Sequence, residues 1–388
     1  MKIDKNIIAL GLVSFFTDMA SSMITTILPL YIVYILNDGV DKLGFILAIA
    51  TFVSYGFRFL FGYLSDRFQV VKPFVVIGYT ISAITKPLLY FSSSWQSVAT
   101  LRGVERIGKS IRSATKDRLI SAYSSGKSGK TFGFHKMMDI AGEMMGAIIV
   151  FLALFYIGKD ITVFKSIFAW SLLPGILAVI TVIFFVKDVP YTKKKKKKID
   201  LNLSQDKKLL PLLYIYFGFI FFMFNDSFFI IKAKENISIE YIPLFIVLLT
   251  FTQTITSYYF GILTDKIGVN KILNISYIFG IVAMGMLYFN FIFLSFIFLG
   301  LFLVSSINSL RSYISNEAIN KASIYGILYT GVTFFNSIGV IIISLIWKNY
   351  NDNFAIIFSL IGIITIFIIN ILFNLYNKSP EKNEATLR

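Results

Sequence analysis

Two copies of one short motif, Gly62-Tyr63-Leu64-Ser65-Asp66-Arg67 and Gly261-Ile262-Leu263-Thr264-Asp265-Lys266, decide the architecture that this sequence predicts. Each copy closes a long apolar run, and the two copies are 199 positions apart. A further lysine follows each copy at the same distance, Lys72 after the first and Lys271 after the second. Repetition at a fixed spacing indicates a duplicated structural unit.

The repeat extends beyond these motifs. Arg112 and Arg311 share the offset of 199 positions. Asp18 and Asp226 occupy matching places near the start of each half, and each follows a Phe-x pair, Phe16-Thr17 or Phe224-Asn225. We therefore interpret the chain as two halves with one common ancestor.

The composition places both halves in a membrane. The chain has 388 residues, of which 56% are hydrophobic and 15% are charged, and its mean hydropathy is +0.75. Soluble domains carry about 25% charged residues. A span and its connection take roughly 30 residues, so this length accommodates about twelve helices that cross the membrane.

Twelve apolar runs are long enough to cross a hydrocarbon core of about 30 Å. The sequence thus predicts an all-α membrane protein with twelve transmembrane helices in two pseudo-symmetric six-helix bundles. The bundles are expected at 1–186 and 209–376, joined by a Lys-rich cytoplasmic linker at 187–208 and followed by a cytoplasmic tail at 377–388. The runs are 7–36, 42–64, 72–92, 95–120, 132–158, 161–186, 209–236, 239–263, 271–289, 291–315, 322–347 and 353–376.

The distribution of basic residues predicts the orientation. If the N-terminus is inside, the inside segments carry 24 Lys and Arg residues and the outside segments carry six. Cytoplasmic loops are the ones enriched in Lys and Arg. We therefore expect a multi-pass protein of the cell membrane with both termini in the cytoplasm. The unbroken run Lys193–Lys198 repels itself and predicts a solvated linker, with contacts to anionic lipid as a secondary role.

Several site classes are excluded by composition. The chain has no cysteine and one histidine, His135, which excludes disulfides, thiolate sites and multi-imidazole metal sites. We expect no metal and no cofactor. The net charge of +16 does not indicate nucleic-acid binding, because the basic residues flank spans and do not form a soluble face.

The doubled Gly-x-Leu-x-Asp-(Arg/Lys) loop resembles the signature of the major facilitator superfamily, whose fold is two six-helix bundles around a central cavity. Gln69 stands where the family pattern has a glycine, whereas the second copy keeps Gly268. Other segments are similar to one bacterial and archaeal branch of permeases: Ser14–Asp18 with Pro29–Tyr31, Arg102–Arg112, Thr131–His135 with Asp139, and Asn225–Phe228 with Lys232.

Ionisable residues inside the predicted spans are costly and indicate function by default. His135, Asp139 and Glu143 follow one another at steps of four, and Gly142 and Gly146 predict close helix contact. Arg102 matches the basic position of the span-four motif that family proton antiporters use. The expected cavity and proton-coupling residues are Asp18, Arg102, Glu105, Arg106, Asp139, Glu143 and Asp226. A self-paired network that only holds helices together is the alternative.

The second predicted group forms a cytoplasmic gate. By resemblance, the two loop motifs act as a conformational latch, and Lys109 and Arg112 serve either this gate or the ligand. The gate residues are Gly62, Asp66, Arg67, Lys109, Arg112, Gly261, Asp265, Lys266 and Arg311.

These features predict a secondary transporter that works by alternating access. The sequence has no Gly-x-x-x-x-Gly-Lys-(Ser/Thr) loop, so an ion gradient is the expected energy source. We predict proton-coupled export of a small organic solute by a monomer. Uptake or exchange of an anionic solute, or a receptor without flux on the same fold, are the alternatives. Enzyme motifs such as Gly-x-Ser-x-Gly and His-Glu-x-x-His are absent, so an enzyme is not expected.

Overall fold

The computed structural model describes residues 4–68, 71–123, 128–188 and 206–378, and every regular element in these ranges is a helix. The chain divides into two compact units. The first comprises Met1–Lys197 and Asp226–Thr254, and the second comprises Lys198–Asn225 and Ile255–Arg388. Most of the predicted linker, including Lys193–Lys198, and most of the predicted tail lie outside the described residues.

Eleven helices or helix pairs in the described ranges are long and apolar enough to cross a membrane. They match eleven of the twelve predicted runs. The remaining run, 95–120, coincides with α5 (Trp95–Tyr123), which has 29 residues. That length suffices to cross the bilayer, but with its many charged side chains α5 is not among the helices that are apolar enough to count as a membrane span by composition. The all-helical prediction is confirmed, and the count of twelve stays a prediction.

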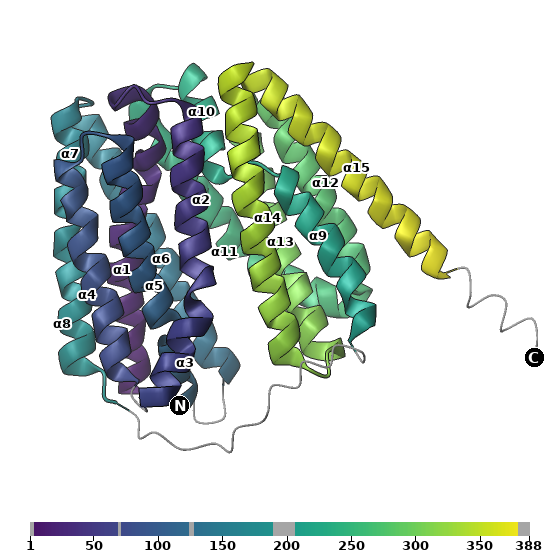
Figure 1. Ribbon diagram of the computed structural model, residues 1–388, viewed down its shortest axis with the longest axis horizontal. Helices are drawn as coiled ribbons and strands as arrows, with labels where there is room; N and C mark the ends of the chain where they lie inside the picture. Colours follow the sequence, from purple (N-terminus) through teal and green to yellow (C-terminus); the bar gives the residue numbers. More distant parts are fainter. Residues whose placement is uncertain (1–3, 69–70, 124–127, 189–205, 379–388) are drawn as a thin grey trace, which may run out of the picture. The chain divides into compact units, whose positions relative to one another are not determined.

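The first unit is a bundle in which α1 packs along α6 and α8, and α5 packs between α2 and α4 (Figure 1). Apolar side chains from several of these helices form one buried cluster, which includes Leu10, Val75, Leu119 and Val182. The elements of this unit are α1 (Lys5–Leu30), α2 (Val40–Gly56), α3 (Arg58–Phe68), α4 (Lys72–Leu88), α5, α6 (Ser128–Tyr156), α7 (Ile161–Trp170), α8 (Leu172–Phe185), α10 (Asp226–Asn236) and the first part of α11 (Ile242–Ile267).

Three predicted spans are interrupted where one continuous helix was expected. The run 42–64 is divided into α2 and α3 at Phe57, directly after Gly56. The run 161–186 is divided into α7 and α8 at Ser171, where Pro174 lacks the N–H that would bond to the carbonyl of Trp170. The run 209–236 ends as a helix at Phe222 and resumes at Asp226, because the backbone of Met223 is extended.

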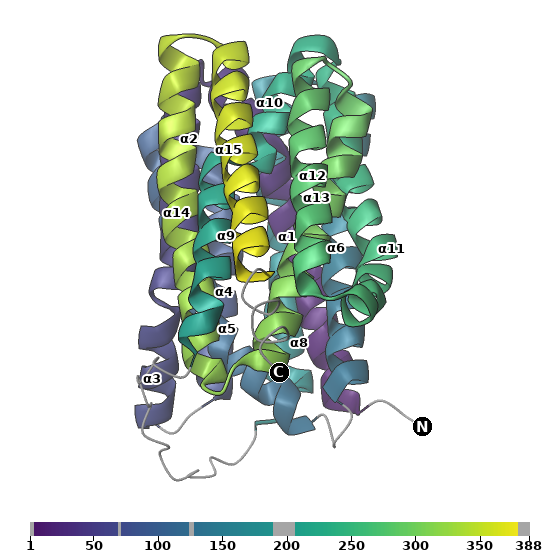
Figure 2. The same ribbon diagram turned by 90° about the vertical axis from the view of Figure 1, so that its right-hand side faces the viewer.

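The second unit is also helical throughout its described part. Helix α12 packs against α13 and α15, and α9 packs against α14 and α15 (Figure 2). Its elements are α9 (Leu210–Phe222), the second part of α11, α12 (Val269–Tyr288), α13 (Ile292–Glu317), α14 (Lys321–Asn349) and α15 (Asp352–Lys378). Gly268 precedes α12 with φ of +86°, a conformation that favours glycine, which explains the glycine in the second loop motif.

The compact units differ from the predicted bundles in one segment. Residues 226–254 group with the first unit, whereas the predicted second bundle begins at 209. Within the first unit this segment is held by an ion pair of 2.7 Å between Lys159 Nζ and Glu240 Oε1. A longer hydrogen bond of 3.4 Å runs from the Tyr34 hydroxyl to the carbonyl of Ile231. The predicted domain boundaries therefore stay a prediction.

Candidate functional site

The first unit contains a partly open polar cavity of about 310 Å³ among α1, α4, α5 and α6. Its wall carries eight ionisable Lys, Arg, Asp and Glu side chains, five basic and three acidic. The lining residues are Ser14, Thr17, Asp18, Ser21, Ser22, Thr25, Tyr79, Arg106, Lys109, Arg112, Ser113, Lys116, Lys136, Asp139 and Glu143.

Helix α1 supplies a hydroxyl-bearing wall. Its lining residues recur at steps of three and four, so they share one face of the helix. Asp18 lies in the middle of this stripe and has neither an ion pair nor a hydrogen bond to any described residue. The hydroxyl oxygens of Thr17 and Ser22 are buried and likewise lack a hydrogen-bond partner in the described part of the chain.

Helix α5 supplies the basic wall. Arg106, Lys109, Arg112 and Lys116 follow at steps of three and four and therefore form one stripe. Arg112 is buried, and its guanidinium lies 4.6 Å from the ring centroid of Tyr79 on α4. The side chain reaches α4 because the two helices pack closely: a Cβ at Gly78 would lie 2.6 Å from the carbonyl oxygen of Gly108.

Helix α6 supplies the acidic wall with Asp139 and Glu143, together with Lys136 at its rim. The predicted close contact of Gly142 and Gly146 is confirmed. A Cβ at Gly142 would collide with the carbonyl oxygen of Phe15, and one at Gly146 with that of Met19. These two glycines bring the backbones of α6 and α1 together and thus place Glu143 and Asp18 in one cavity.

His135 links the α6 and α1 walls at one end of the cavity. Its Nε2 lies 2.8 Å from Ser14 Oγ, and its Nδ1 lies 3.3 Å from Asp139 Oδ1. Lys116 Nζ donates to the same Ser14 Oγ at 3.4 Å. No group of three or more His, Asp or Glu side chains in the described ranges could hold a metal ion. The histidine is a hydrogen-bonding residue here.

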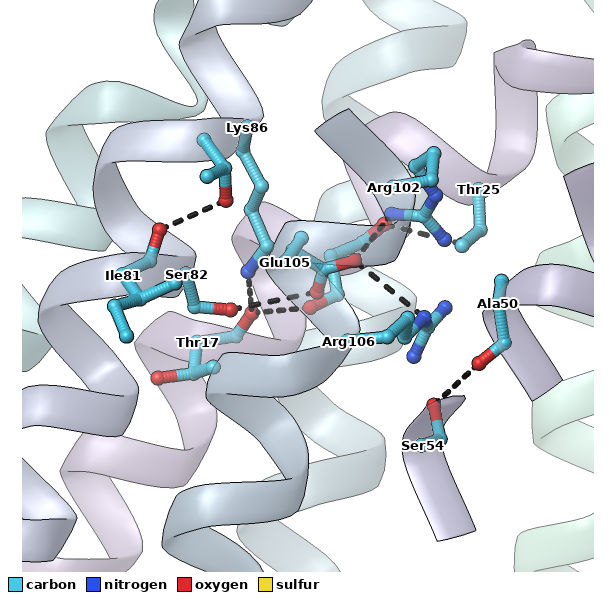
Figure 3. Close-up of polar contacts among 12 residues, drawn as sticks. Thr17, Thr25, Ala50, Ser54, Ile81, Ser82, Lys86, Arg102, Glu105 and Arg106 are labelled. Carbon is cyan, nitrogen blue, oxygen red and sulfur yellow. Dashed lines mark hydrogen bonds and ion pairs between the residues drawn. The ribbon is translucent and has the colours of Figure 1, made fainter. Parts of the chain in front are cut away.

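A buried ionic network stands beside the cavity (Figure 3). Glu105 Oε2 accepts from Arg102 Nη1 at 2.7 Å and lies 3.4 Å from Arg106 Nε, while Ser82 Oγ donates to its other oxygen at 3.3 Å. Lys86 is buried and donates to the carbonyl of Thr17 at 3.2 Å. Arg102 and Glu105 do not line the cavity, but their network fixes Arg106, which does.

The predicted site residues thus separate into two groups in space. Asp18, Arg106, Asp139 and Glu143 line the cavity, as do Lys109 and Arg112 from the predicted gate. Asp226 begins α10, is exposed, and accepts at Oδ1 from the backbone N–H of Ser227. It does not line the cavity, although its charge acts on Arg106 and Glu143.

The other predicted gate residues lie outside the cavity wall. Gly62 and Arg67 are on α3, and Gly261 and Lys266 are on α11, with both basic side chains exposed. The side chains of Asp66 and Asp265 lie outside the described residues, so the proposed latch stays a prediction. Arg311 is exposed on α13, where its Nε donates to the Tyr329 hydroxyl at 3.1 Å.

Sequence reasoning missed several cavity residues. The hydroxyl stripe on α1 was overlooked because serine and threonine are common in spans, although their spacing in an apolar helix was a usable signal. Lys116 and Lys136 are not among the predicted cavity residues, yet both line the cavity. Lys116 follows Arg112 by four residues, so the helical period already placed it on the basic stripe.

Comparison with known proteins agrees with this architecture. The profile of the Major Facilitator Superfamily matches residues 10–289. A protein of Methanocaldococcus jannaschii, named as an uncharacterized MFS-type transporter, is 32% identical over 363 residues, which cover 89% of each chain. A mutant of the nucleoside transporter NupG has a similar fold, with a TM-score of 0.81 at 14% identity over 94% of this chain and 99% of the other. A peptide-bound POT family transporter reaches a TM-score of 0.76 at 13% identity over 95% and 96% of the two chains. This chain belongs to the major facilitator superfamily of membrane transporters.

Proposed function

We propose that this chain is a secondary active transporter, which moves a small organic solute by alternating access and couples that movement to protons. One observation carries the proposal. Asp18 and Glu143 line a polar cavity inside the first unit, and neither has an ion-pair partner in the described part of the chain. Burial disfavours the charged form of a carboxylate, so such a group can load a proton on one side and release it on the other.

Export driven by proton entry is the direction that we propose first. Arg102 stands at the basic position of the span-four motif of family antiporters, and its partner Glu105 holds Arg106 beside the cavity. In this proposal the chain is a monomer of the cell membrane with both termini cytoplasmic. The loop motifs at 62–67 and 261–266 act as its cytoplasmic gate, and no enzymatic step, cofactor or metal takes part.

Uptake or exchange of an anionic solute is the second candidate. The observation that favours it is the composition of the cavity wall, where five basic residues face three acidic ones. Arg and Lys side chains are the groups that recognise carboxylates and phosphates. The two candidates predict opposite directions of solute movement under the same proton gradient, so one experiment separates them.

The test uses purified protein in liposomes with an imposed pH gradient and a pH-sensitive dye inside. Addition of solutes from a mixed panel is expected to change the internal pH for the transported solute only. Asp18→Asn abolishes this coupled proton movement, whereas the control Asp160→Asn, at an exposed helix cap, retains it. Solute flux that is indifferent both to the gradient and to Asp18→Asn contradicts proton coupling.

A further inference from the structure

We propose that the solute carries a carboxylate or phosphate group, which binds between Lys109, Arg112 and Arg106. Hydroxyl or carbonyl groups elsewhere on the solute form hydrogen bonds with Thr17 and Ser22. The inference rests on the second candidate of the proposed function, uptake or exchange of an anionic solute, and it names where in the same cavity the anion binds. It depends on three features of the wall: cations of which only Arg106 has an ion pair, hydroxyls without hydrogen-bond partners, and cavity carboxylates that are not paired with these cations.

The basic wall holds positive charge that the protein does not neutralise by contact. The ammonium group of Lys109 makes no ion pair and no hydrogen bond with the described residues. The Arg112 guanidinium lies over the ring of Tyr79, its Nη1 donates to the carbonyl oxygen of Gly78 at 3.4 Å, and it makes no ion pair with a described residue. Arg106 meets Glu105 through Nε alone. These three cations lie on successive turns of α5, so one group with several anionic oxygens can meet all of them.

The acidic residues of the cavity do not replace such a ligand. Asp139 Oδ1 lies 3.3 Å from His135 Nδ1 but has no hydrogen-bond partner in the described ranges, and Asp139 Oδ2 lies 4.0 Å from Lys136 Nζ. Asp18 and Glu143 form no ion pair with a described residue, although both lie in the field of the basic wall. The cavity therefore keeps more basic than acidic groups, and the excess is on α5.

Two buried hydroxyls provide an independent sign of a ligand. Thr17 and Ser22 line the cavity and are 4% and 1% exposed, and their buried side-chain oxygens have no hydrogen-bond partner in the described ranges. Buried polar groups in proteins nearly always have a partner. A solute that brings donors or acceptors to α1 and anionic oxygens to α5 satisfies both walls at once.

The same geometry sets the sign of the coupling between solute and proton. Protonation of Asp18 or Glu143 removes a negative charge from the cavity, so it strengthens the attraction for an anion and weakens it for a cation. The proton and an anionic solute therefore bind together and move in the same direction, as in the second candidate of the proposed function, uptake of an anionic solute. The charged and titratable groups that face Asp18 and Glu143 are Lys86 of α4, Arg106, Lys109, Arg112 and Lys116 of α5, His135, Lys136 and Asp139 of α6, and Asp226 of α10.

The experiment measures thermal stabilisation of the purified full-length protein by probes in charge-matched sets. One set is gluconate, glucose and glucosamine, a second is succinate, succinamide and 1,4-diaminobutane, and glucose 6-phosphate and glycerol phosphate represent phosphate esters. We expect stabilisation by at least one acidic probe, stronger at acidic than at neutral pH, and none by the neutral and cationic probes. Stabilisation by neutral or cationic probes alone, or by no acidic probe, overturns the inference.

Variants then locate the binding site. Lys109→Gln and Arg112→Gln are each expected to weaken binding of that acidic probe about tenfold or more, the scale of a hydrogen bond to a charged group. Arg58→Gln is the control. Arg58 lies on α3 outside the cavity and pairs with Asp117 of α5, so its loss is expected to leave binding of the acidic probe unchanged. Equal weakening by all three variants indicates general attraction to a basic protein and also overturns the inference.

Failure of this inference and failure of the proposed function are distinguishable, because binding is measured without flux. An acidic probe that binds to the cavity but is never transported contradicts the transporter proposal alone. Proton-coupled movement of a neutral or cationic solute contradicts the anion site alone.

Discussion

Helices α5 and α13 occupy equivalent positions in the repeat, but they carry different chemistry. At the offset of 199 positions, Arg106 corresponds to Ser305 and Lys109 corresponds to Asn308. Of the four basic residues of the stripe, only Arg112 has a basic counterpart, Arg311, whereas Lys116 corresponds to Ser315. The buried Glu105 of α5 has Val304 as its counterpart. One helix of the pair is thus ionic where the other is neutral.

The neutral helix shows that the packing does not need the charges. In α13, Ser305 accepts a hydrogen bond of 2.7 Å from Ser276 of α12, and Asn308 Nδ2 donates to Ser257 of α11 at 3.1 Å. Neutral hydroxyls and amides therefore join the helices of the second unit. Because ionic groups in a span are more costly than these, the charges of α5 are best explained by the cavity that they line or support.

The two helices are expected to differ most in the stability that is lost when Glu105 of α5 or its counterpart Val304 of α13 is replaced by alanine. Glu105→Ala leaves the buried Arg102 and the half-buried Arg106 without their partner, and breaking a buried ion pair typically costs about 3–5 kcal/mol. Val304→Ala removes only two methyl groups, at about 0.8 kcal/mol each. Thermal unfolding in detergent is expected to show a clearly lower midpoint for Glu105→Ala. Equal shifts for the two variants would mean that the ionic network contributes no more than apolar packing.

Each unit is expected to lose stability in the same way where a glycine lets two of its own helices approach closely. Gly142 faces the carbonyl of Phe15, and Gly339 faces that of Phe221, so a methyl group at either position collides with backbone. Gly142→Ala and Gly339→Ala should each destabilise by about 1–3 kcal/mol, the usual cost of overpacking. Gly285→Ala in α12 is the control: no atom lies within 4 Å of its added Cβ, and alanine favours a helix. If Gly285→Ala is also destabilised, the loss of stability in the other two variants cannot be attributed to the collision of the added methyl group with backbone.

A smaller difference is expected in the cation–π energy of the basic residue that both helices share, Arg112 in α5 and Arg311 in α13. Arg112 is buried against Tyr79 at 4.6 Å, whereas Arg311 is exposed and lies 5.8 Å from the ring of Tyr329. Cation–π contacts contribute about 2 kcal/mol when desolvated and about 0.5–1 kcal/mol when exposed. Double-mutant cycles of Arg112→Gln with Tyr79→Leu and of Arg311→Gln with Tyr329→Leu measure both terms. The comparison fails if the exposed pair shows the larger coupling.

The smallest expected effect is at Asn308. Asn308→Ala removes one neutral hydrogen bond to Ser257, with a net contribution of about 1 kcal/mol. Unfolding in detergent is expected to show this small shift, and probe binding to the cavity should not change. At the equivalent position of α5, Lys109→Gln is expected to have the opposite profile, with little change in stability and a large loss of probe binding. An unchanged affinity in Lys109→Gln would remove the functional contrast between the helices.

Much of the fold was predictable because it depends on local composition and repetition. The predicted all-helical fold and the membership of the major facilitator superfamily are confirmed. The interruptions of three spans were harder to predict, since hydropathy does not register a single proline or an extended residue such as Met223. At the site, the helical period placed Arg106, Lys109 and Arg112 on one stripe, but it did not say which neighbouring helix the stripe faces.

The amino-acid sequence by itself determined that this chain crosses a membrane, that its two halves repeat, and that unusual charge is concentrated in α5 and α6. These properties follow from hydropathy, spacing and side-chain type, which are local along the chain. Only the tertiary structure decided that Arg102 and Glu105 pair with each other beside the cavity, while Lys109, Arg112 and Asp18 share its wall. Residues on four different helices meet there because glycines such as Gly142 and Gly78 set how closely those helices approach, and this distance is a property of packed pairs that no single segment encodes.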